Sequence, residues 1–113
     1  TISKMMITYN MPVIGIQNIA GEVPEEFALS QNFPNPFNPV TKIRFQISGS
    51  SIAQTFLSVY DINGKEISLL VNADLKPGSY EISFDASGLS SGVYFYKISA
   101  GSFTDVKKMI LVK

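Results

Sequence analysis

Apolar and polar side chains alternate along most of the chain after Phe27, and this period of two constrains the fold more than any other feature. In residues 42–47, three apolar residues alternate with a lysine, an arginine and a glutamine. In residues 80–85, a tyrosine, an isoleucine and a phenylalanine are separated by polar residues in the same way. Successive side chains of a β-strand point to opposite faces, so both segments are typical of strands with one buried face and one solvated face.

Turn signals separate the alternating segments. Asn63-Gly64 is typical of the two-residue type I′ turn of a β-hairpin, and Ala100-Gly101 predicts a second tight hairpin. No segment has a helical pattern, and strands are expected at residues 27–31, 42–47, 57–60, 65–71, 80–85, 93–99 and 102–112. We therefore predict an all-β fold: a seven-stranded antiparallel Ig-like β-sandwich with an N-terminal extended strand and linker.

The N-terminal residues 1–26 differ in composition from the rest of the chain. Residues 1–10 mix β-branched residues, methionines and a tyrosine, and we interpret them as the end of a preceding domain or as a donor strand. Residues 11–26 hold two prolines and two glycines, which indicates a linker, with a short strand compatible at residues 13–16. The predicted domain is thus 27–113. Because the chain begins at Thr1 and shows no signal peptide, we expect a C-terminal piece of a longer precursor.

The composition argues against several classes of function. Cysteine and histidine are both absent, which removes thiol and imidazole catalysis, disulfides and zinc sites built on these residues. The acidic residues are scattered over predicted turns and solvated faces, so we expect no enzyme, no metal and no other cofactor. Nine basic residues balance nine acidic ones, so the net charge predicts no nucleic-acid partner. No apolar run is long enough for a membrane span.

A dense proline cluster precedes the alternating strands. Residues 34–39 read Pro-Asn-Pro-Phe-Asn-Pro. Each proline fixes its own φ and moves the preceding residue out of the helical region, so we expect these residues to be extended. Two later segments also stand out: residues 89–97, which contain Gly-Val-Tyr-Phe-Tyr-Lys, and the terminal residues 107–113, which contain three lysines around an apolar run.

With these three segments, the chain resembles the C-terminal sorting domains of the bacterial type IX (Por) secretion system. The resemblance covers residues 23–113, and the segments follow one another in the order that the family has. A similar Ig-like module occurs in the flagellar hook-capping protein. The Pro-Asn-Pro cluster and the lysine-flanked terminal strand favour the secretion family over that one.

The resemblance implies a non-enzymatic signal domain that directs an attached upstream cargo through the type IX translocon. Export would proceed via the periplasm to the cell surface or the medium, with removal near residues 14–26 and a sortase-like attachment step. The family motif corresponds to Pro34, Asn35, Pro36, Phe37, Asn38, Pro39, Gly78, Tyr80, Gly92 and Tyr94. The segment that the translocon would recognise corresponds to Lys107, Lys108, Met109, Ile110, Leu111, Val112 and Lys113.

Several alternatives stay open at this level. Residues 107–113 can be an edge strand whose lysines prevent aggregation, a segment read by a receptor, or both. Tyr80 can form a tyrosine corner or be a core ring with its hydroxyl at the surface. Residues 94–96 are expected to be core aromatics, with a stacking surface for sugar or nucleic acid as the weaker interpretation. The runner-up function is a structural subunit of an extracellular filament, in which residues 1–10 donate a strand to a neighbouring copy.

Overall fold

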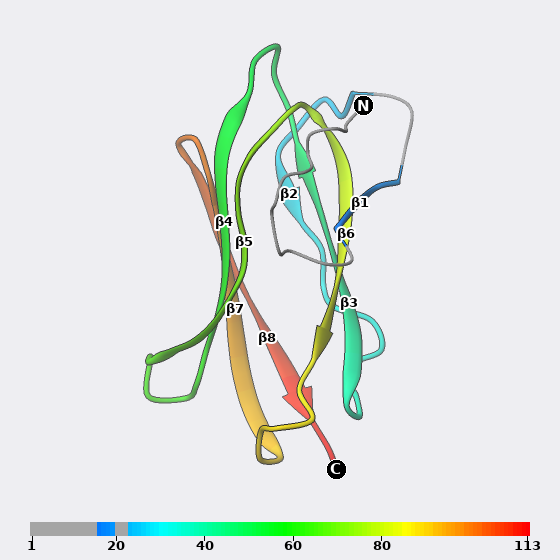
Figure 1. Cartoon of the computed structure of the whole chain (residues 1–113), viewed down its shortest axis with the longest axis vertical. Helices are drawn as coiled ribbons and strands as arrows, with labels where there is room; N and C mark the ends of the chain where they lie inside the picture. Colours follow the sequence, from blue (N-terminus) through cyan, green and yellow to red (C-terminus); the bar gives the residue numbers. More distant parts are fainter. Residues whose placement is uncertain (1–15, 20–22) are drawn as a thin grey trace.

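The computed structural model describes residues 16–19 and 23–113, and its elements in this part of the chain are all β-strands. Their bounds are β1 (Gln17–Asn18), β2 (Ala28–Leu29), β3 (Val40–Ile47), β4 (Ala53–Tyr60), β5 (Glu66–Leu75), β6 (Gly78–Asp85), β7 (Gly92–Ala100) and β8 (Phe103–Leu111). They form two four-stranded sheets, in the orders β1-β6-β3-β2 and β5-β4-β7-β8. The sheets face each other as two layers (Figure 1), and every pair of named strands is antiparallel.

The structure confirms the all-β antiparallel sandwich but adds a strand to the predicted seven. The additional strand, β1, has two residues and pairs with β6, with Gln17 opposite Glu81. It lies in the range predicted to be linker, and two residues are too few to show a period of two. The predicted strand at residues 1–10 and most of the compatible one at 13–16 lie outside the described residues.

Strands β3 and β6 form the centre of the first sheet. Both show the regular alternation of apolar and polar side chains that the sequence predicts. Ile43, Phe45 and Ile47 are all buried, as their spacing predicts. Phe45 lies directly opposite Tyr80 in the register, and the two rings stack with centroids 5.5 Å apart. Aromatic cross-strand pairs of this kind stabilise a sheet by roughly 0.2–1 kcal/mol relative to a pair of alanines.

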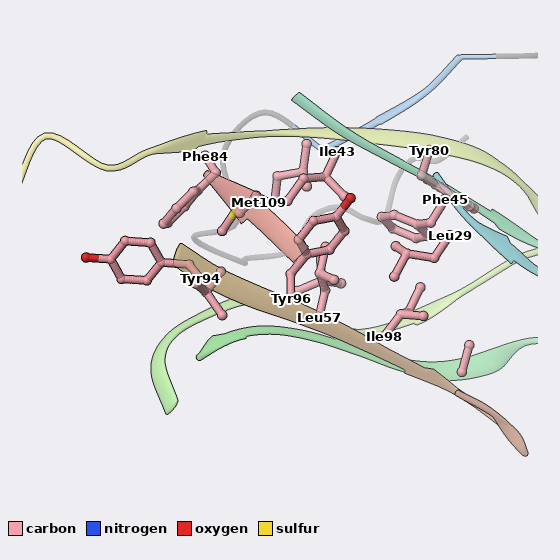
Figure 2. Close-up of a cluster of buried hydrophobic side chains, with 14 of the residues drawn as sticks. Leu29, Ile43, Phe45, Leu57, Tyr80, Phe84, Tyr94, Tyr96, Ile98 and Met109 are labelled. Carbon is pink, nitrogen blue, oxygen red and sulfur yellow. The ribbon is translucent and has the colours of Figure 1, made fainter. Parts of the chain in front are cut away.

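The core between the sheets is completed by side chains from β4, β7 and β8. Leu57, Tyr96, Ile98 and Met109 have no exposed surface, and Figure 2 shows them packed with side chains of the first sheet. Burying an aliphatic or aromatic side chain of this size contributes roughly 1.5–3 kcal/mol. Packing of this core therefore holds together a domain that has no cysteine for a disulfide.

The hairpin between β4 and β5 differs from the prediction. The Gly64 N–H donates to the Asp61 C=O at 3.0 Å, so Ile62 and Asn63 are the central residues of the turn. The Asp61 carboxylate also accepts from the Asn63 and Lys65 N–H groups at 2.9 and 3.0 Å. The predicted two-residue Asn63-Gly64 turn is therefore wrong, because the aspartate side chain stabilises a longer turn in which Gly64 has a φ of +85°.

Candidate recognition surface

The terminal strand β8 lies at the edge of the second sheet and pairs with β7. Its side chains alternate strictly near the chain end. Met109 and Leu111, the inner row of the tail, are 0% and 1% exposed and belong to the core. Lys108, Ile110 and Val112, the outer row of the tail, point the other way and are exposed, half-buried and exposed in turn. Five of the seven residues predicted for recognition therefore form two rows, of which the inner one is inaccessible from outside. Of the other two, Lys107 is half-buried and Lys113 is exposed.

The backbone edge of β8 that faces away from β7 is occupied near its end. Residues 31–39, which we call the proline clasp, lie along this edge. The Phe37 N–H donates to the Ile110 C=O at 2.9 Å, and the Val112 N–H donates to the Phe37 C=O at 3.0 Å. These bonds make a parallel bridge between Phe37 and Leu111. The clasp thus does for the end of β8 what a neighbouring strand would do.

Two polar side chains extend this cover along the edge. The Asn35 Oδ1 atom accepts from the Ile110 N–H at 2.9 Å. The Gln31 Nε2 atom donates to the Lys108 C=O at 2.6 Å. Backbone groups of Lys108, Ile110 and Val112 are therefore satisfied within the chain, and an added strand could pair with them only after the clasp had left.

The prediction that the proline cluster is extended is wrong. The clasp first pairs with β3, through reciprocal backbone bonds of 3.0 and 2.9 Å between Phe33 and Lys42. It then bends at residues 34–36, reaches β8 in the other sheet at Phe37, and bends again at 38–39 before β3 begins. The peptide bonds before all three prolines are cis. The clasp has to bend because it contacts both sheets within a few residues. A fully extended segment would point away from the sandwich instead of reaching β8.

Phe37 anchors the middle of the clasp in the core. Its side chain is 2% exposed, and its ring centroid lies 6.3 Å from that of Phe84 on β6. The open side of the sandwich between β3 and β8 is thereby closed by an aromatic ring. Truncating a buried phenylalanine lowers the free energy of unfolding by about 3–5 kcal/mol, so removal of the clasp would strongly destabilise the domain.

A buried polar network fixes the first half of the clasp. The Asn32 side chain is 2% exposed, and its Nδ2 atom donates to the Pro34 C=O at 3.1 Å and to the Thr41 Oγ1 atom at 3.0 Å. The Thr41 hydroxyl donates to the same Pro34 carbonyl at 2.8 Å, and Gln31 Nε2 donates to Asn32 Oδ1 at 2.7 Å. Sequence reasoning missed Asn32 and Thr41, although a polar residue at the buried end of an alternating strand was a usable signal.

The two Gly-x-Tyr segments of the predicted family motif, residues 78–80 and 92–94, both form tyrosine corners. The Tyr80 hydroxyl donates to the Lys76 C=O at 2.7 Å, which decides between the two alternatives for Tyr80 in favour of the corner. The Tyr94 hydroxyl donates to the Ser90 C=O at 2.6 Å, four residues upstream as in the first case. Burial raises the pKa of Tyr80 above its ordinary value, which agrees with a hydroxyl that stays protonated as a donor.

The glycines of the two motifs have different reasons to be there. A Cβ on Gly78 would lie 2.9 Å from the Asn18 Nδ2 atom of β1, so any other residue here would displace the end of this side chain. Gly92 has a φ of +154°, a conformation that strains other residues. In the structure, the motif residues Gly78, Tyr80, Gly92 and Tyr94 therefore act on the turns that lead into β6 and β7.

The last residue is tied to the loop between β6 and β7. The Lys113 Nζ atom donates to the Ser87 C=O at 2.6 Å and to the Leu89 C=O at 2.7 Å. The Lys113 N–H donates to the Ser91 Oγ atom at 2.9 Å. Hydrogen bonds from Ser87, together with the nearby Lys113 charge, hold the pKa of the Asp85 carboxyl below its usual value. The tail is therefore an integrated part of the domain as far as its final lysine.

The three consecutive aromatics of β7 divide between the two faces of the sheet. Tyr94 and Tyr96 are buried, which confirms the core interpretation for them, and Phe95 is half-buried on the outer face. The Tyr96 hydroxyl donates to the Ser30 C=O at 2.6 Å, next to the clasp. Burial, with a smaller contribution from the charge of Asp105, raises the pKa of Tyr96 to about 12.

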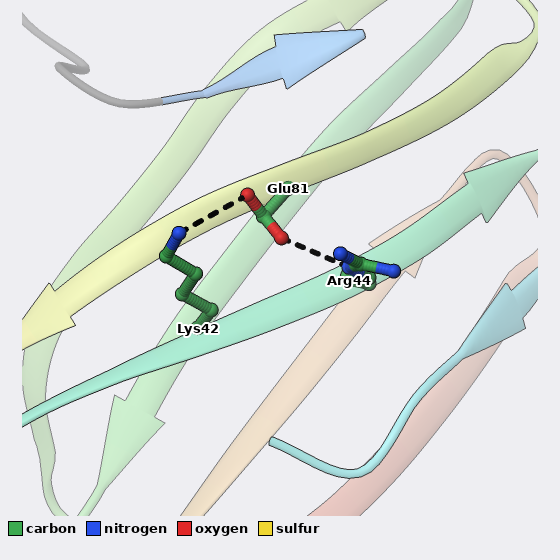
Figure 3. Close-up of polar contacts among 3 residues, drawn as sticks. All are labelled: Lys42, Arg44 and Glu81. Atoms are coloured by element: carbon green, nitrogen blue, oxygen red, sulfur yellow. Dashed lines mark hydrogen bonds and ion pairs between the residues drawn. The ribbon is translucent and has the colours of Figure 1, made fainter. Parts of the chain in front are cut away.

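Three carboxylates among the described residues have clear structural roles. Glu81 on β6 pairs with Arg44 at 2.9 Å and with Lys42 at 3.8 Å, both on β3 (Figure 3). Asp61 and Asp85 accept backbone N–H groups of their own turns. Within residues 16–19 and 23–113 there is no group of three or more acidic side chains that could hold a metal ion. No helix in that part of the chain could span a membrane.

Residues 31–113 match the model of the secretion system C-terminal sorting domain. The chain therefore belongs to the family of type IX secretion C-terminal sorting domains. A search of curated proteins finds no match. Members of this family are sorting signals rather than catalysts, and they carry their cargo to the cell surface or the medium.

Proposed function

We propose that this chain is the address of an exported protein and that the type IX translocon reads it as a folded domain after the precursor reaches the periplasm. The observation that carries the proposal is the division of the tail. Its inner row holds the core, whereas its outer row of Lys108, Ile110 and Val112 faces solvent at the edge of the sheet. Recognition and folding therefore use different side chains of one strand.

The remaining steps of the proposal concern the upstream side. The cargo is attached before the domain, and cleavage within residues 14–26 releases it, with a sortase-like protein joining it to the surface. The exposed side chains of Gln17, Asn18 and Ile19, which lie within this range, support access for a protease. Mass spectrometry of cargo recovered from the medium tests this: a C-terminus within residues 14–26 is expected, and a cargo that keeps all of β8 contradicts cleavage there.

The outer row provides the test of recognition. Deleting residues 109–113 would also remove the buried Met109 and Leu111, so a loss of export could come from unfolding alone. A better variant changes only the two exposed residues of the outer row, Lys108→Glu and Val112→Ser, in a reporter fusion expressed in a bacterium with a type IX system. We expect the fusion to remain in the periplasm with the melting temperature of the isolated domain nearly unchanged.

Lys76→Glu is the matched control because Lys76 is an exposed lysine in the β5–β6 turn, which lies at the other end of the sandwich from the C-terminus (Figure 1). It should be exported as the unaltered fusion is. Normal surface delivery of the outer-row variant would overturn the proposal, as would equal retention of the Lys76→Glu fusion.

A further inference from the structure

The two backbone sides of β8 leave little room for recognition by strand addition at the chain end. One side pairs with β7, and the other side is occupied by the clasp at Lys108, Ile110 and Val112. Because Phe37 anchors the clasp in the core, a partner strand would have to expose that ring before it could pair. The loss of this buried aromatic contact favours a partner that contacts side chains instead.

The outer face of the second sheet offers such side chains. A shallow, open hollow lies on this face and is lined by Tyr60, Asp61, Ile62, Gly64, Phe95, Lys97 and Val106. Ile62 is 69% exposed and Val106 is 51% exposed, so large aliphatic surface is left in water here. Exposed apolar surface gathered around a depression is typical of a protein interaction site.

The hollow is continuous with the outer row of the tail. In the register of β7 and β8, Phe95 lies opposite Lys108, and Lys97 lies opposite Val106. Tyr60 of β4 lies on the other side of Phe95. One contiguous surface therefore runs from the β4–β5 turn across β7 to the tail.

Charge indicates what this surface binds. Lys97 and Lys108 are exposed, and neither forms an ion pair within the described residues, where both ion pairs belong to Glu81. Asp61 also lines the hollow, but its carboxylate accepts two backbone N–H groups of its own turn. The lysines are thus free to meet carboxylates of a partner, next to apolar side chains that would be buried by it.

From these observations we infer that the hollow is a docking surface for a segment of the export machinery that inserts a large apolar side chain between Ile62, Phe95 and Val106. A carboxylate beside that side chain pairs with Lys97. The inference rests on the proposed function and deepens it, since it moves the centre of recognition from the last residues to the face of the sheet. A few buried apolar anchors commonly carry most of the energy of such an interface.

The test uses the reporter fusion with Ile62→Ser and Val106→Ser together, and separately with Lys97→Glu. These side chains are exposed, so the melting temperature should stay close to that of the unaltered domain. We expect the double variant to lower the exported fraction about tenfold, which corresponds to the loss of one anchor. Lys97→Glu should lower the exported fraction by a smaller factor. It should also make the exported fraction less dependent on the salt concentration of the medium.

Phe33→Ser is the control, because Phe33 is 80% exposed but lies beside Lys42 on the first sheet. Export of the hollow variants at the unaltered level, or equal loss in Phe33→Ser, overturns the inference. Failure of the unaltered fusion to be exported would instead contradict the proposed function itself. Sedimentation of the isolated domain identifies a second copy as the occupant if it dimerises and the hollow variants do not, and this result too would overturn the inference.

Discussion

The inner and outer rows of the tail belong to one strand and have opposite tasks. Met109 and Leu111 are buried between the sheets, whereas Lys108 and Val112 are exposed beside them. Because the side-chain period of a strand is two, a shift of one residue would exchange the rows. The comparison teaches that, under the proposed function, the outer row can be presented only when the domain is folded in register, and that truncation of the tail removes both rows together.

The largest expected effect on the free energy of unfolding comes from a substitution in the inner row. Leu111→Ala should lower the free energy of unfolding by about 2–5 kcal/mol, since it leaves a cavity where a fully buried side chain was. Val112→Ala, one residue further along, should change it by less than about 0.5 kcal/mol. Urea denaturation of both variants measures the difference, and equal destabilisation would mean that the rows are not distinct.

A second prediction uses the tyrosine that supports the inner row from β7. The pKa of Tyr96 is about 12 in the folded domain, above its ordinary value, because the ring is buried. Its contribution is complete below about pH 10 and is lost as the pH rises from about 10 to about 12, by about 2–3 kcal/mol in total. Denaturation at these pH values should show that Tyr96→Phe loses less free energy of unfolding than the unaltered domain does. Identical losses in the two proteins would contradict the raised pKa of Tyr96.

The clasp covers the backbone edge of the tail, and Asn32 holds the clasp in place. Asn32→Ala leaves the Thr41 and Pro34 groups with fewer partners in a buried site, so we expect about 1–3 kcal/mol of destabilisation. Hydrogen exchange of the Ile110 and Val112 amides should become faster. Asn38→Ala is the control, because that side chain is exposed and forms no hydrogen bond within the described residues.

A smaller effect concerns the tyrosine corner next to the tail. Tyr94→Phe removes the bond to the Ser90 C=O and should cost about 0.5–1.5 kcal/mol. Tyr60→Phe removes a hydroxyl that has no hydrogen-bond partner in the described part of the chain and should be nearly neutral. The melting temperatures of the two variants measure the difference. If Tyr94→Phe is also neutral, the tyrosine corner at Tyr94 does not contribute to stability.

The smallest effect is expected for the outer row. Lys108→Glu should change the free energy of unfolding by less than about 0.5 kcal/mol, because the side chain is exposed and has no ion-pair partner among the described residues. Chemical denaturation at low salt gives the value. A loss of several kcal/mol would show that this lysine belongs to the fold.

Local pattern was sufficient for much of the fold. β3 and β6 follow directly from their alternation, and residues 102–112 were expected as the last strand where β8 runs from Phe103 to Leu111. The Asp61 turn was missed because the Asn-Gly rule considers two residues, whereas the aspartate side chain acts on the residues after it. β1 depends on pairing with β6 rather than on a pattern of its own.

The sequence shows which residues form the clasp, but it does not show where the clasp lies in the fold. Its prolines identify the segment, but the bridge from Phe37 to Leu111 joins residues far apart in the chain, and no local rule predicts such a pair. The same holds for Asn35 and Ile110. The hollow also arises from the sheet, since Ile62, Phe95 and Val106 come from a turn and two strands that only the register brings together.

The most direct measurement of the central claim compares export with stability across the variants of both rows. For each fusion, the exported fraction is plotted against the free energy of unfolding of its isolated domain. The account predicts that inner-row variants lose export only as far as they lose folding, and that outer-row variants remain folded and are retained in the cell. If all variants fall on one line, stability alone decides export, and the outer row is not the address.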